Sequence, residues 1–387
     1  MRPTRWAALL VTALWMMQPS MAPAHVSPTL TLDRELLDLV NRIESGQIEH
    51  AEQLADRLIV TYPGSRAVQL LYADLHNIRA GRPVSMAPQE SYSRQMLEVL
   101  SELKSRRAHA ADNPLPGHIP ANILAVRAET RHVIAVDLSR SRLYLLERLS
   151  ASEPFSVREH HYVSIGQGGI GKVFEGDLKT PVGIYRIDGF REDAQLPPLY
   201  GAGAFTLNFP NALDQQNGFD GTGIWLHGVP RSQLSRPPLS SEGCVVMRNA
   251  LIEHLLNIID RDNTPVLLAS HLSWVRPGDY SASAESLLSM LRGEPAESAP
   301  PSTGARLLAL AGDHIKGLFS EPTPTLDTSI NADVFVYPEH PNVNASTPVY
   351  QVSFLHSNQA EAGSTLITEY WHFAPSIGWS RVLDTPK

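Results

Sequence analysis

The sequence of 387 residues contains a single cysteine, Cys244. An internal disulfide needs two cysteines, so none can form. In an oxidising compartment an unpaired thiol is a liability, and its presence is easier to explain if the thiol has a use. The alternative is that Cys244 is a small buried side chain, which is what most lone cysteines are.

The sequence also lacks basic blocks and zinc-finger spacing. It has 32 Lys and Arg against 40 Asp and Glu, a net charge of -8, which argues against nucleic acid as a partner. Gly166–Gly171, GQGGIG, has no Lys-Ser/Thr after it and no helical pattern, so it is not a P-loop. We interpret it as a flexible turn. His160-His161 has no third ligand at a recognisable spacing, so we expect no metal and no cofactor.

Long apolar runs are missing beyond the first 24 residues. The run Trp6–Met17 follows two arginines and is shorter than the roughly 20 residues of a membrane span. Ala22–Ala24 has the small-x-small pattern of a cleavage site. We therefore predict that residues 1–24 are a secretory signal and that no stable membrane anchor remains after cleavage. An uncleaved anchor is the alternative.

A chain of this length is expected to form two or three domains. Apolar side chains recur at helical spacing over residues 28–112, with breaks at Gly46 and Pro63-Gly64. The segment GQIEHAEQLADRLIVTYPGS resembles a tetratricopeptide repeat, although about three repeats are needed for a free-standing array. We expect a small helical module that packs on the rest of the chain, as a packing cap or as a docking site for a partner or glycan.

The last helix expected in this module is Ser91–Ala111, with Leu97, Leu100 and Leu103 along one packed side. A Pro-rich connector follows it. Strands are then expected at Val133–Val136, Leu143–Leu146, Tyr162–Ile165, Gly183–Ile187, Ile224–His227, Cys244–Met247 and Val266–Ala269. A helix at Ala250–Asp260 would take Asn249 as its N-cap.

His227 and Cys244 stand at the ends of two of these strands. IWLHG is typical of a buried strand that enters a turn, and GCVVM of a turn that opens a strand. Neighbouring strands would place both side chains on one sheet, facing each other. Because a free thiol has a pKa of about 8.5, it needs a base at neutral pH, and histidine is the usual one. If the pair is catalytic we expect a lowered thiol pKa, and otherwise an ordinary or buried thiol.

The pair His227-Gly228, a loop and then Ser241-x-Gly243-Cys244 resembles the active-site signature of the L,D-transpeptidase catalytic domain, the YkuD domain. Four further segments occur in the family's order: Val133–Glu147, Lys172–Ile187, Asn208–Ala212 and Gly221–Gly228. The resemblance covers about residues 130–270. It implies a β-sandwich-like fold with the cysteine in a groove.

One position departs from the family. Many members have arginine two residues after the cysteine, where this chain has Val246, and an arginine appears only at Arg248. Glu242 stands where histidine or arginine is common. We expect Arg248 either to bind a substrate carboxylate in place of the missing arginine or to be solvated. Lys172 and Lys179 could meet anionic substrate groups, but exposed lysines are usually solvated.

The resemblance implies roles for the other residues. His227 would take the thiol proton of Cys244 or stabilise its thiolate, and the Gly228 carbonyl would orient the imidazole. Gly243 would permit a tight turn that leaves the Cys244 N–H free for an oxyanion hole. Ser241 would donate to the same oxyanion or hold the turn.

The resemblance also implies the substrate, a peptidoglycan stem peptide cleaved before its terminal D-alanine through a thioacyl-enzyme. The acceptor would be a neighbouring diaminopimelate, an envelope lipoprotein lysine or water. Location in the periplasm follows from the signal. A non-catalytic cell-wall-binding protein is the alternative; a papain-like protease fits less well, since its histidine follows its cysteine.

The composition of residues 293–304 indicates a linker. Residues 305–387 then have a helical pattern, Ala305–Phe319, followed by strand-like runs that loosely resemble the nuclear transport factor-like fold. The expected fold class is therefore multidomain α+β. A mostly-β catalytic domain, residues 125–272, is flanked by the helical module, residues 28–112, and a small C-terminal α+β domain.

Overall fold

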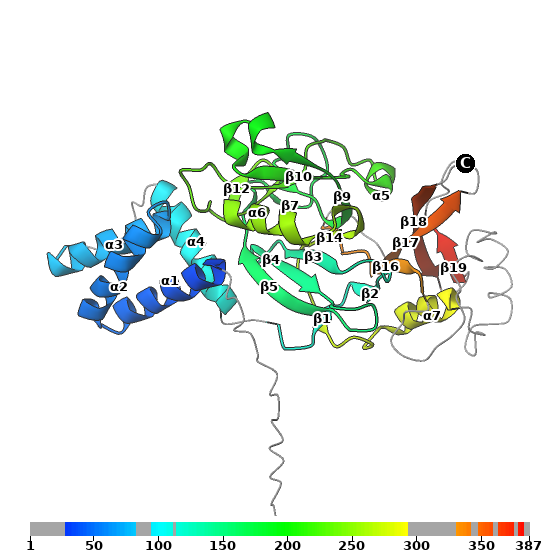
Figure 1. Cartoon of the computed structure of the whole chain (residues 1–387), viewed down its shortest axis with the longest axis horizontal. Coiled ribbons are helices and arrows are strands. Elements are labelled where there is room, and N and C mark those ends of the chain that lie inside the picture. The colour runs from blue at the N-terminus through cyan, green and yellow to red at the C-terminus, as the bar shows by residue number, and fades with distance from the viewer. Residues whose placement is uncertain are drawn as a thin grey trace, which may run out of the picture.

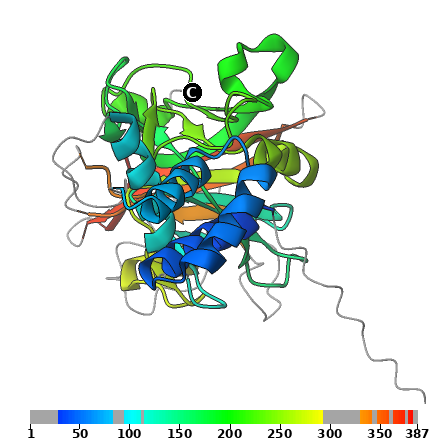
Figure 2. The ribbon, with the colours of Figure 1, turned by 90° about the vertical axis from the view of Figure 1, so that its left-hand side faces the viewer.

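The computed structural model describes residues 28–82, 94–110, 114–292, 330–341, 347–358, 363–374 and 378–382. The predicted signal, residues 1–24, the linker, residues 293–304, and the helix expected at Ala305–Phe319 lie outside the described residues. A helical part, a β-rich central part and a C-terminal sheet follow one another along the longest axis (Figure 1). Seen from the helical end, these helices stand in front of the central sheet (Figure 2). No helix among the described residues has the length and apolarity needed to cross a membrane.

Four helices make up the N-terminal part: α1 (Pro28–Glu44), α2 (Ile48–Thr61), α3 (Arg66–Arg79) and α4 (Arg94–Ala110). Their apolar faces share one core that runs from Leu32 to Leu103. The side chain of Ser65 caps α3 by accepting from the Val68 N–H. The expectation for α4 is partly wrong, because Leu97 is 53% exposed and Val99 is buried in its place.

The central sheet has eight strands in the order β13-β11-β10-β9-β14-β3-β4-β5. Their bounds are β3 (His132–Asp137), β4 (Arg142–Glu147), β5 (Ser156–Tyr162), β9 (Gly183–Glu192), β10 (Gly203–Leu207), β11 (Trp225–His227), β13 (Val245–Val246) and β14 (Pro265–Ala269). The pairs β11–β13 and β14–β3 are parallel and the others antiparallel. Only the run expected at Tyr162–Ile165 is divided, because β5 ends at Tyr162 and a new strand begins at Ile165.

Helix α6 (Asn249–Ile258) buries Leu251, Ile252 and Leu255 in the core on one face of this sheet. A second cluster of buried side chains, including Tyr144 and Leu267, covers the other face. The central part is therefore a curled sheet with apolar packing on both faces, as the expected fold class requires. Short elements connect its strands: η1 (Asp193–Gln195), η2 (Pro198–Tyr200), α5 (Ala212–Gln216) and η3 (Arg261–Asn263).

The segment GQGGIG contains the expected turn at Gln167–Gly168, but short paired strands flank it on both sides. It contributes β6 (Ile165–Gly166), paired with β12 (Leu239–Ser241), and β7 (Gly169–Ile170), paired with β8 (Lys179–Thr180). A Cβ added at Gly166 would lie 2.2 Å from the Leu178 carbonyl oxygen. Glycine is present there because two backbones approach closely, and this packing brings Lys179 and Thr180 against the strands that lead to Cys244.

The C-terminal sheet has the order β19-β18-β17-β16-β2. Its strands are β2 (Ile123–Ala125), β16 (Ala332–Val336), β17 (Val349–Asn358), β18 (Gly363–Ala374) and β19 (Gly378–Arg381). Helix α7 (Ala282–Leu291) packs in the same core, and β1 (Ile119–Pro120) pairs with β15 (Trp274–Val275). This unit thus draws β2 and α7 from outside the predicted range 305–387. Its nuclear transport factor-like character stays a prediction.

Candidate active site

Parallel pairing of β11 and β13 brings the two candidate residues together. Leu226 lies opposite Val245, and His227 opposite Val246. Cys244 directly precedes β13 and is therefore level with Trp225. Because side chains alternate along a strand, His227 and Cys244 project from the same face of the sheet. Although 17 positions separate them in the sequence, the pairing of two strands brings them to neighbouring positions, as we predicted from the motif.

The His227 imidazole is buried and has a fixed partner. Its Nδ1 lies 2.7 Å from the carbonyl oxygen of Gly228. A carbonyl only accepts, so the neutral ring donates from Nδ1, and its Nε2 lone pair is left to accept a proton. Burial is the main cause that lowers the pKa of His227 to about 4, and the charge of Arg236 adds to it.

The Cys244 thiol is partly buried and donates to the Gly223 carbonyl oxygen at 3.3 Å. Burial raises its pKa to about 11, and the Glu242 charge adds to the increase. A hydrogen bond from the Trp225 backbone, with the charges of Lys172 and Arg236, acts in the opposite direction. The free protein therefore has the buried thiol that we expected of the non-catalytic alternative, and not the lowered thiol pKa that we expected of a catalytic pair. Both groups are neutral at pH 7.

The turn before Cys244 is held by its own side chains. Ser241 Oγ donates to the Cys244 carbonyl oxygen at 2.6 Å and accepts from the Gly243 N–H at 3.2 Å. Gly243 has φ +127°, and a Cβ there would lie 2.8 Å from the Lys179 carbonyl oxygen. Of the two roles that we expected for Ser241, these bonds correspond to holding the turn.

Asn249 does not cap α6 as we expected. The N-cap position belongs to Arg248, and Asn249 is the first helical residue. Its amide instead bonds the backbone beside His227: Oδ1 accepts from Ala202 at 2.9 Å and from Val229 at 3.2 Å, and Nδ2 donates to the Val229 carbonyl at 2.8 Å. The start of the helix therefore braces the turn that follows β11.

Arg248 is buried next to the helical module. It is 8% exposed, and its Nε and Nη1 atoms are buried without a hydrogen-bond partner among the described residues. Burial lowers its pKa, and the charges that act on it are those of Arg106, Tyr62 and Asp33 in the helical module. Val246, at the family's arginine position, is 1% exposed. Neither position offers an accessible cation beside Cys244.

Arg236 is the cation that sequence reasoning missed. It lies in the loop between β11 and β12, and its carbonyl oxygen accepts from Tyr162 Oη at 2.8 Å and Ser164 Oγ at 2.9 Å. Its half-buried guanidinium acts electrostatically on both Cys244 and His227. No sequence pattern indicated it, because a loop arginine has no motif of its own.

Lys172 is buried, contrary to our expectation of a solvated lysine. Its Nζ donates to Asp177 Oδ1 at 3.1 Å and to the Phe174 carbonyl at 3.0 Å. Its positive charge acts to lower the pKa of Cys244, against the larger effect of burial, which raises it. Lys172 therefore fixes the 172–177 loop while placing a positive charge near the thiol. Lys179 is half-buried and contributes its backbone to the packing behind Gly243.

The loop between the two strands is also held from outside the central sheet. The Leu234 N–H donates to the Gly64 carbonyl at 3.2 Å, and the Leu234 side chain packs on the helical core. Ser235 Oγ donates to Glu102 Oε1 at 2.7 Å. Arg106 bonds the same carboxylate and lies 4.1 Å over the Tyr162 ring. The helical module thus contacts the segment that connects His227 to Cys244.

Tyr200 completes the surroundings of the pair. Its ring packs edge-on against His227, with centroids 4.8 Å apart, and lies 5.0 Å from the Trp225 ring. The Tyr200 carbonyl accepts from the Gly228 N–H at 3.1 Å. Burial raises the pKa of the Tyr200 hydroxyl, and the charge of Cys244 contributes. The sequence did not indicate Tyr200, since it lies in the short helix η2, outside both motifs.

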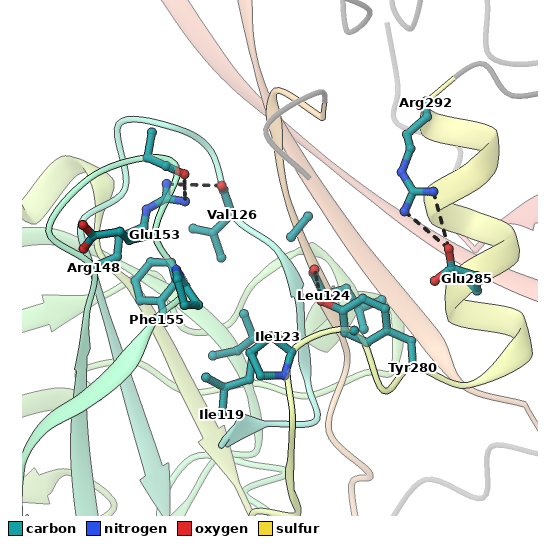
Figure 3. Close-up of a pocket in the computed structure, with 15 residues that line it drawn as sticks. Ile119, Ile123, Leu124, Val126, Arg148, Glu153, Phe155, Tyr280, Glu285 and Arg292 are labelled. Carbon is teal, nitrogen blue, oxygen red and sulfur yellow. Dashed lines mark hydrogen bonds and ion pairs between the residues drawn. The ribbon is translucent and has the colours of Figure 1, made fainter. Parts of the chain in front are cut away.

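A cavity of about 350 Å³ lies elsewhere, between the β4–β5 loop, the β1–β2 segment and α7 (Figure 3). Its two arginines already have partners. Arg148 donates to the carbonyls of Thr130 and Val126, and Arg292 pairs with Glu285. None of its lining residues belongs to β11, β13 or the loop between them. The cavity is therefore separate from the Cys244 site.

Fold and motif together define a protein whose central unit is a curled β-sheet with a histidine and a cysteine on adjacent strands at one edge. Residues 131–268 match the family model of YkuD, the L,D-transpeptidase catalytic domain. This match confirms the resemblance that the motifs indicated.

Solved structures of two proteins resemble the chain. Bd1075 of Bdellovibrio bacteriovorus is 23% identical, with a TM-score of 0.45, over 68% of this chain and 96% of that one. The helical cell shape determining protein Pgp2 of Campylobacter jejuni is 16% identical, with a TM-score of 0.46, over 73% of this chain and 98% of that one. No curated protein matches the chain.

Proposed function

We propose that the protein is a cysteine-dependent L,D-transpeptidase that acts on peptidoglycan stem peptides through a thioacyl-enzyme on Cys244. The observation that carries the proposal is the strand pairing that sets His227 and Cys244 on one face, inside a domain of a transpeptidase family. Peptidoglycan is the substrate that this family implies. Residues 1–24, as a cleaved secretory signal, would deliver the protein to the periplasm, where peptidoglycan lies.

The raised thiol pKa and the lowered imidazole pKa favour the first of the two roles that we expected for His227. His227 Nε2 takes the thiol proton as sulfur attacks, rather than holding a preformed thiolate. The sulfur adds to the carbonyl carbon between diaminopimelate and D-alanine. The backbone N–H of Cys244 donates to the oxyanion, a kind of contact whose loss costs about 3 kcal/mol in barrier.

Collapse of this intermediate breaks the amide bond. The imidazolium returns its proton to the leaving amine, so free D-alanine departs and a thioester remains on Cys244. His227 then accepts a proton from the acceptor amine as that amine attacks the thioester, and the proton goes to the sulfur. The products are a new amide and the original thiol. No metal or cofactor takes part in these steps.

Arg236 is the group that we assign to the substrate carboxylate. It is half-buried, it lies in the loop that flanks the thiol, and its charge acts on Cys244 and His227. Glu242, the carboxylate that acts on it, forms no ion pair with it in the part of the chain that the structure describes. The buried position of Arg248 beside the helical module makes that residue the weaker choice.

The acceptor decides the biological product. A neighbouring diaminopimelate gives a 3–3 cross-link, and a lipoprotein lysine attaches that lipoprotein to the wall. Water gives a carboxypeptidase, or an amidase that releases wall-bound lipoprotein. We place amine acceptors first, because the domain's family is one of transpeptidases.

The test uses the protein without residues 1–24 and a disaccharide-tetrapeptide, followed by mass spectrometry of protein and products. The expected result is an acyl adduct on the wild type, dimeric muropeptide and neither with Cys244→Ala. Release of D-alanine without dimer, also when a lipoprotein lysine peptide is added, would make the enzyme a hydrolase. No adduct and no turnover would refute the enzyme and leave a non-catalytic cell-wall-binding protein.

A further inference from the structure

The peptide unit between Gly228 and Val229 has two functions in this site. Its carbonyl oxygen accepts from His227 Nδ1 at 2.7 Å. Its N–H, on Val229, donates to Asn249 Oδ1 at 3.2 Å. The C=O and N–H of a trans peptide point in opposite directions in one plane. A side chain that holds the N–H therefore also sets the direction of the carbonyl that orients the imidazole.

Asn249 holds this unit at more than one point. Its Nδ2 donates to the Val229 carbonyl at 2.8 Å, and its Oδ1 also accepts from Ala202 at 2.9 Å. Both acceptor positions of the oxygen are used, so its side chain is fixed against the Val229 backbone on both sides. Val229 itself is 1% exposed, so no water replaces these bonds in the folded chain.

Two glycines leave the space that the amide fills. A Cβ at Gly228 or at Gly201 would lie 2.1 Å from Asn249 Oδ1. Gly201 also has φ +62°, in the left-handed region that favours glycine. The absence of a side chain at these two glycines leaves room for the Asn249 amide between two loops. This explains why a glycine follows His227.

We infer that Asn249 is a positioning residue for His227, which fixes the Nδ1–H tautomer through the Gly228–Val229 peptide. The inference rests on the proposed function in that His227 acts as the base. Asn249 touches neither substrate nor thiol in this role. It keeps Nε2 free of a proton and aimed along the face that carries Cys244.

The experiment compares Asn249→Ala and Asn249→Asp with wild type by nitrogen NMR of histidine-labelled protein, the His227 signals being assigned with His227→Gln. We expect the wild type to show one neutral tautomer at pH 7, with the proton on Nδ1. Asn249→Ala should show both tautomers. Asn249→Asp keeps an acceptor for the Val229 N–H but loses the donor to the Val229 carbonyl, so the Nδ1–H tautomer should be more populated than in Asn249→Ala.

Kinetics supply the second measurement. A general base contributes roughly 10²- to 10⁴-fold, and a misplaced one loses part of this. We therefore expect kcat to fall by about 10- to 100-fold in Asn249→Ala while KM stays within about threefold. Asn211→Ala is the matched control, because Asn211 is also buried and also bonds to backbone groups, but to those of Ile184 and Asp214 and not to those beside His227. It should lower the stability without changing the His227 signals.

A single Nδ1–H tautomer in Asn249→Ala, or an unchanged kcat, would overturn the inference. The NMR comparison needs no turnover. If the wild type fails to process the stem peptide, the proposed function is refuted while the tautomer comparison still decides the role of Asn249.

Discussion

The rate at which an alkylating agent reacts with Cys244 should be low at pH 7 and should rise steadily with pH. Burial raises the thiol pKa to about 11 and lowers the His227 pKa to about 4. At pH 7 the thiolate fraction is then on the order of 10⁻⁴, against roughly 10⁻² for a thiol with the reference value of 9.0. Alkylation of the free protein should be about 100-fold slower than that of a solvent-exposed thiol.

The assay follows iodoacetamide addition by intact mass from pH 5 to pH 10. Since Cys244 is the only cysteine, each adduct reports on it alone. The rate should rise tenfold per pH unit without a plateau up to pH 10. Unfolded protein in denaturant provides the control for an ordinary thiol.

A plateau that extends down to pH 5 would refute the reasoning, because only a preformed thiolate–imidazolium pair reacts at a constant rate there. A raised thiol pKa does not make the domain a mere binding protein. In the mechanism that we propose, His227 removes the proton only as the carbonyl carbon is attacked.

Further predictions concern the surroundings of the pair. In the Cys244→Ala background, Arg236→Gln should weaken binding of a tetrapeptide by about 10-fold or more, in line with roughly 1.5–3 kcal/mol for a hydrogen bond to a charged group. Calorimetry with the C-terminally amidated peptide is the control. If the protein that retains Arg236 binds the acid and the amide equally well, the assignment is contradicted. Ser241→Ala should lower kcat because it frees the turn at Cys244, whereas Ser240→Ala, whose hydroxyl bonds only the Pro237 carbonyl, should leave the rate of D-alanine release near the wild-type value. Ser235→Ala leaves Glu102 with one donor fewer, so hydrogen exchange of residues 229–240 should speed up and turnover should fall severalfold; unchanged exchange would mean that the helical module does not restrain the loop. Burial raises the pKa of Asp214 to about 6, so the folded state binds the Asp214 proton more tightly than the unfolded state does. The stabilisation from this proton is present below about pH 4 and is lost as the pH rises through about 6. Asp214→Asn should therefore raise the free energy of unfolding at pH 7.5 by up to about 3 kcal/mol, without a similar gain at pH 4.

The sequence predicted the elements that carry strong local patterns. Periodic apolar residues located the helices of residues 28–112 and the strands of the central sheet, because burial of one face imposes the period. The motif around His227 and Cys244 predicted that the two strands would be neighbours, and β11 and β13 are paired. These are features in which local pattern and global fold agree.

The environment of those residues was not predictable in the same way. Asparagine is a residue type that is common at N-caps, but the Asn249 side chain bonds to the Val229 backbone and not to its own helix. Arg248 was a candidate for substrate binding because the family's arginine is missing two positions earlier. The charged groups that surround it belong to the helical module, over 140 positions earlier in the chain. The direction of the Cys244 pKa shift follows from burial, which no sequence pattern reports.

The order of strands in the C-terminal sheet has a consequence for how the chain matures. Strand β2 is made before the whole central sheet, whereas its partner β16 comes after it. During synthesis, β2 emerges with an unpaired edge, and an unpaired edge is a template for pairing with other chains. The central sheet can close on its own residues, but the C-terminal sheet is complete only when the last part of the chain arrives. Truncation near residue 330 should therefore leave a protein that folds at its centre and aggregates through the exposed edge of β2.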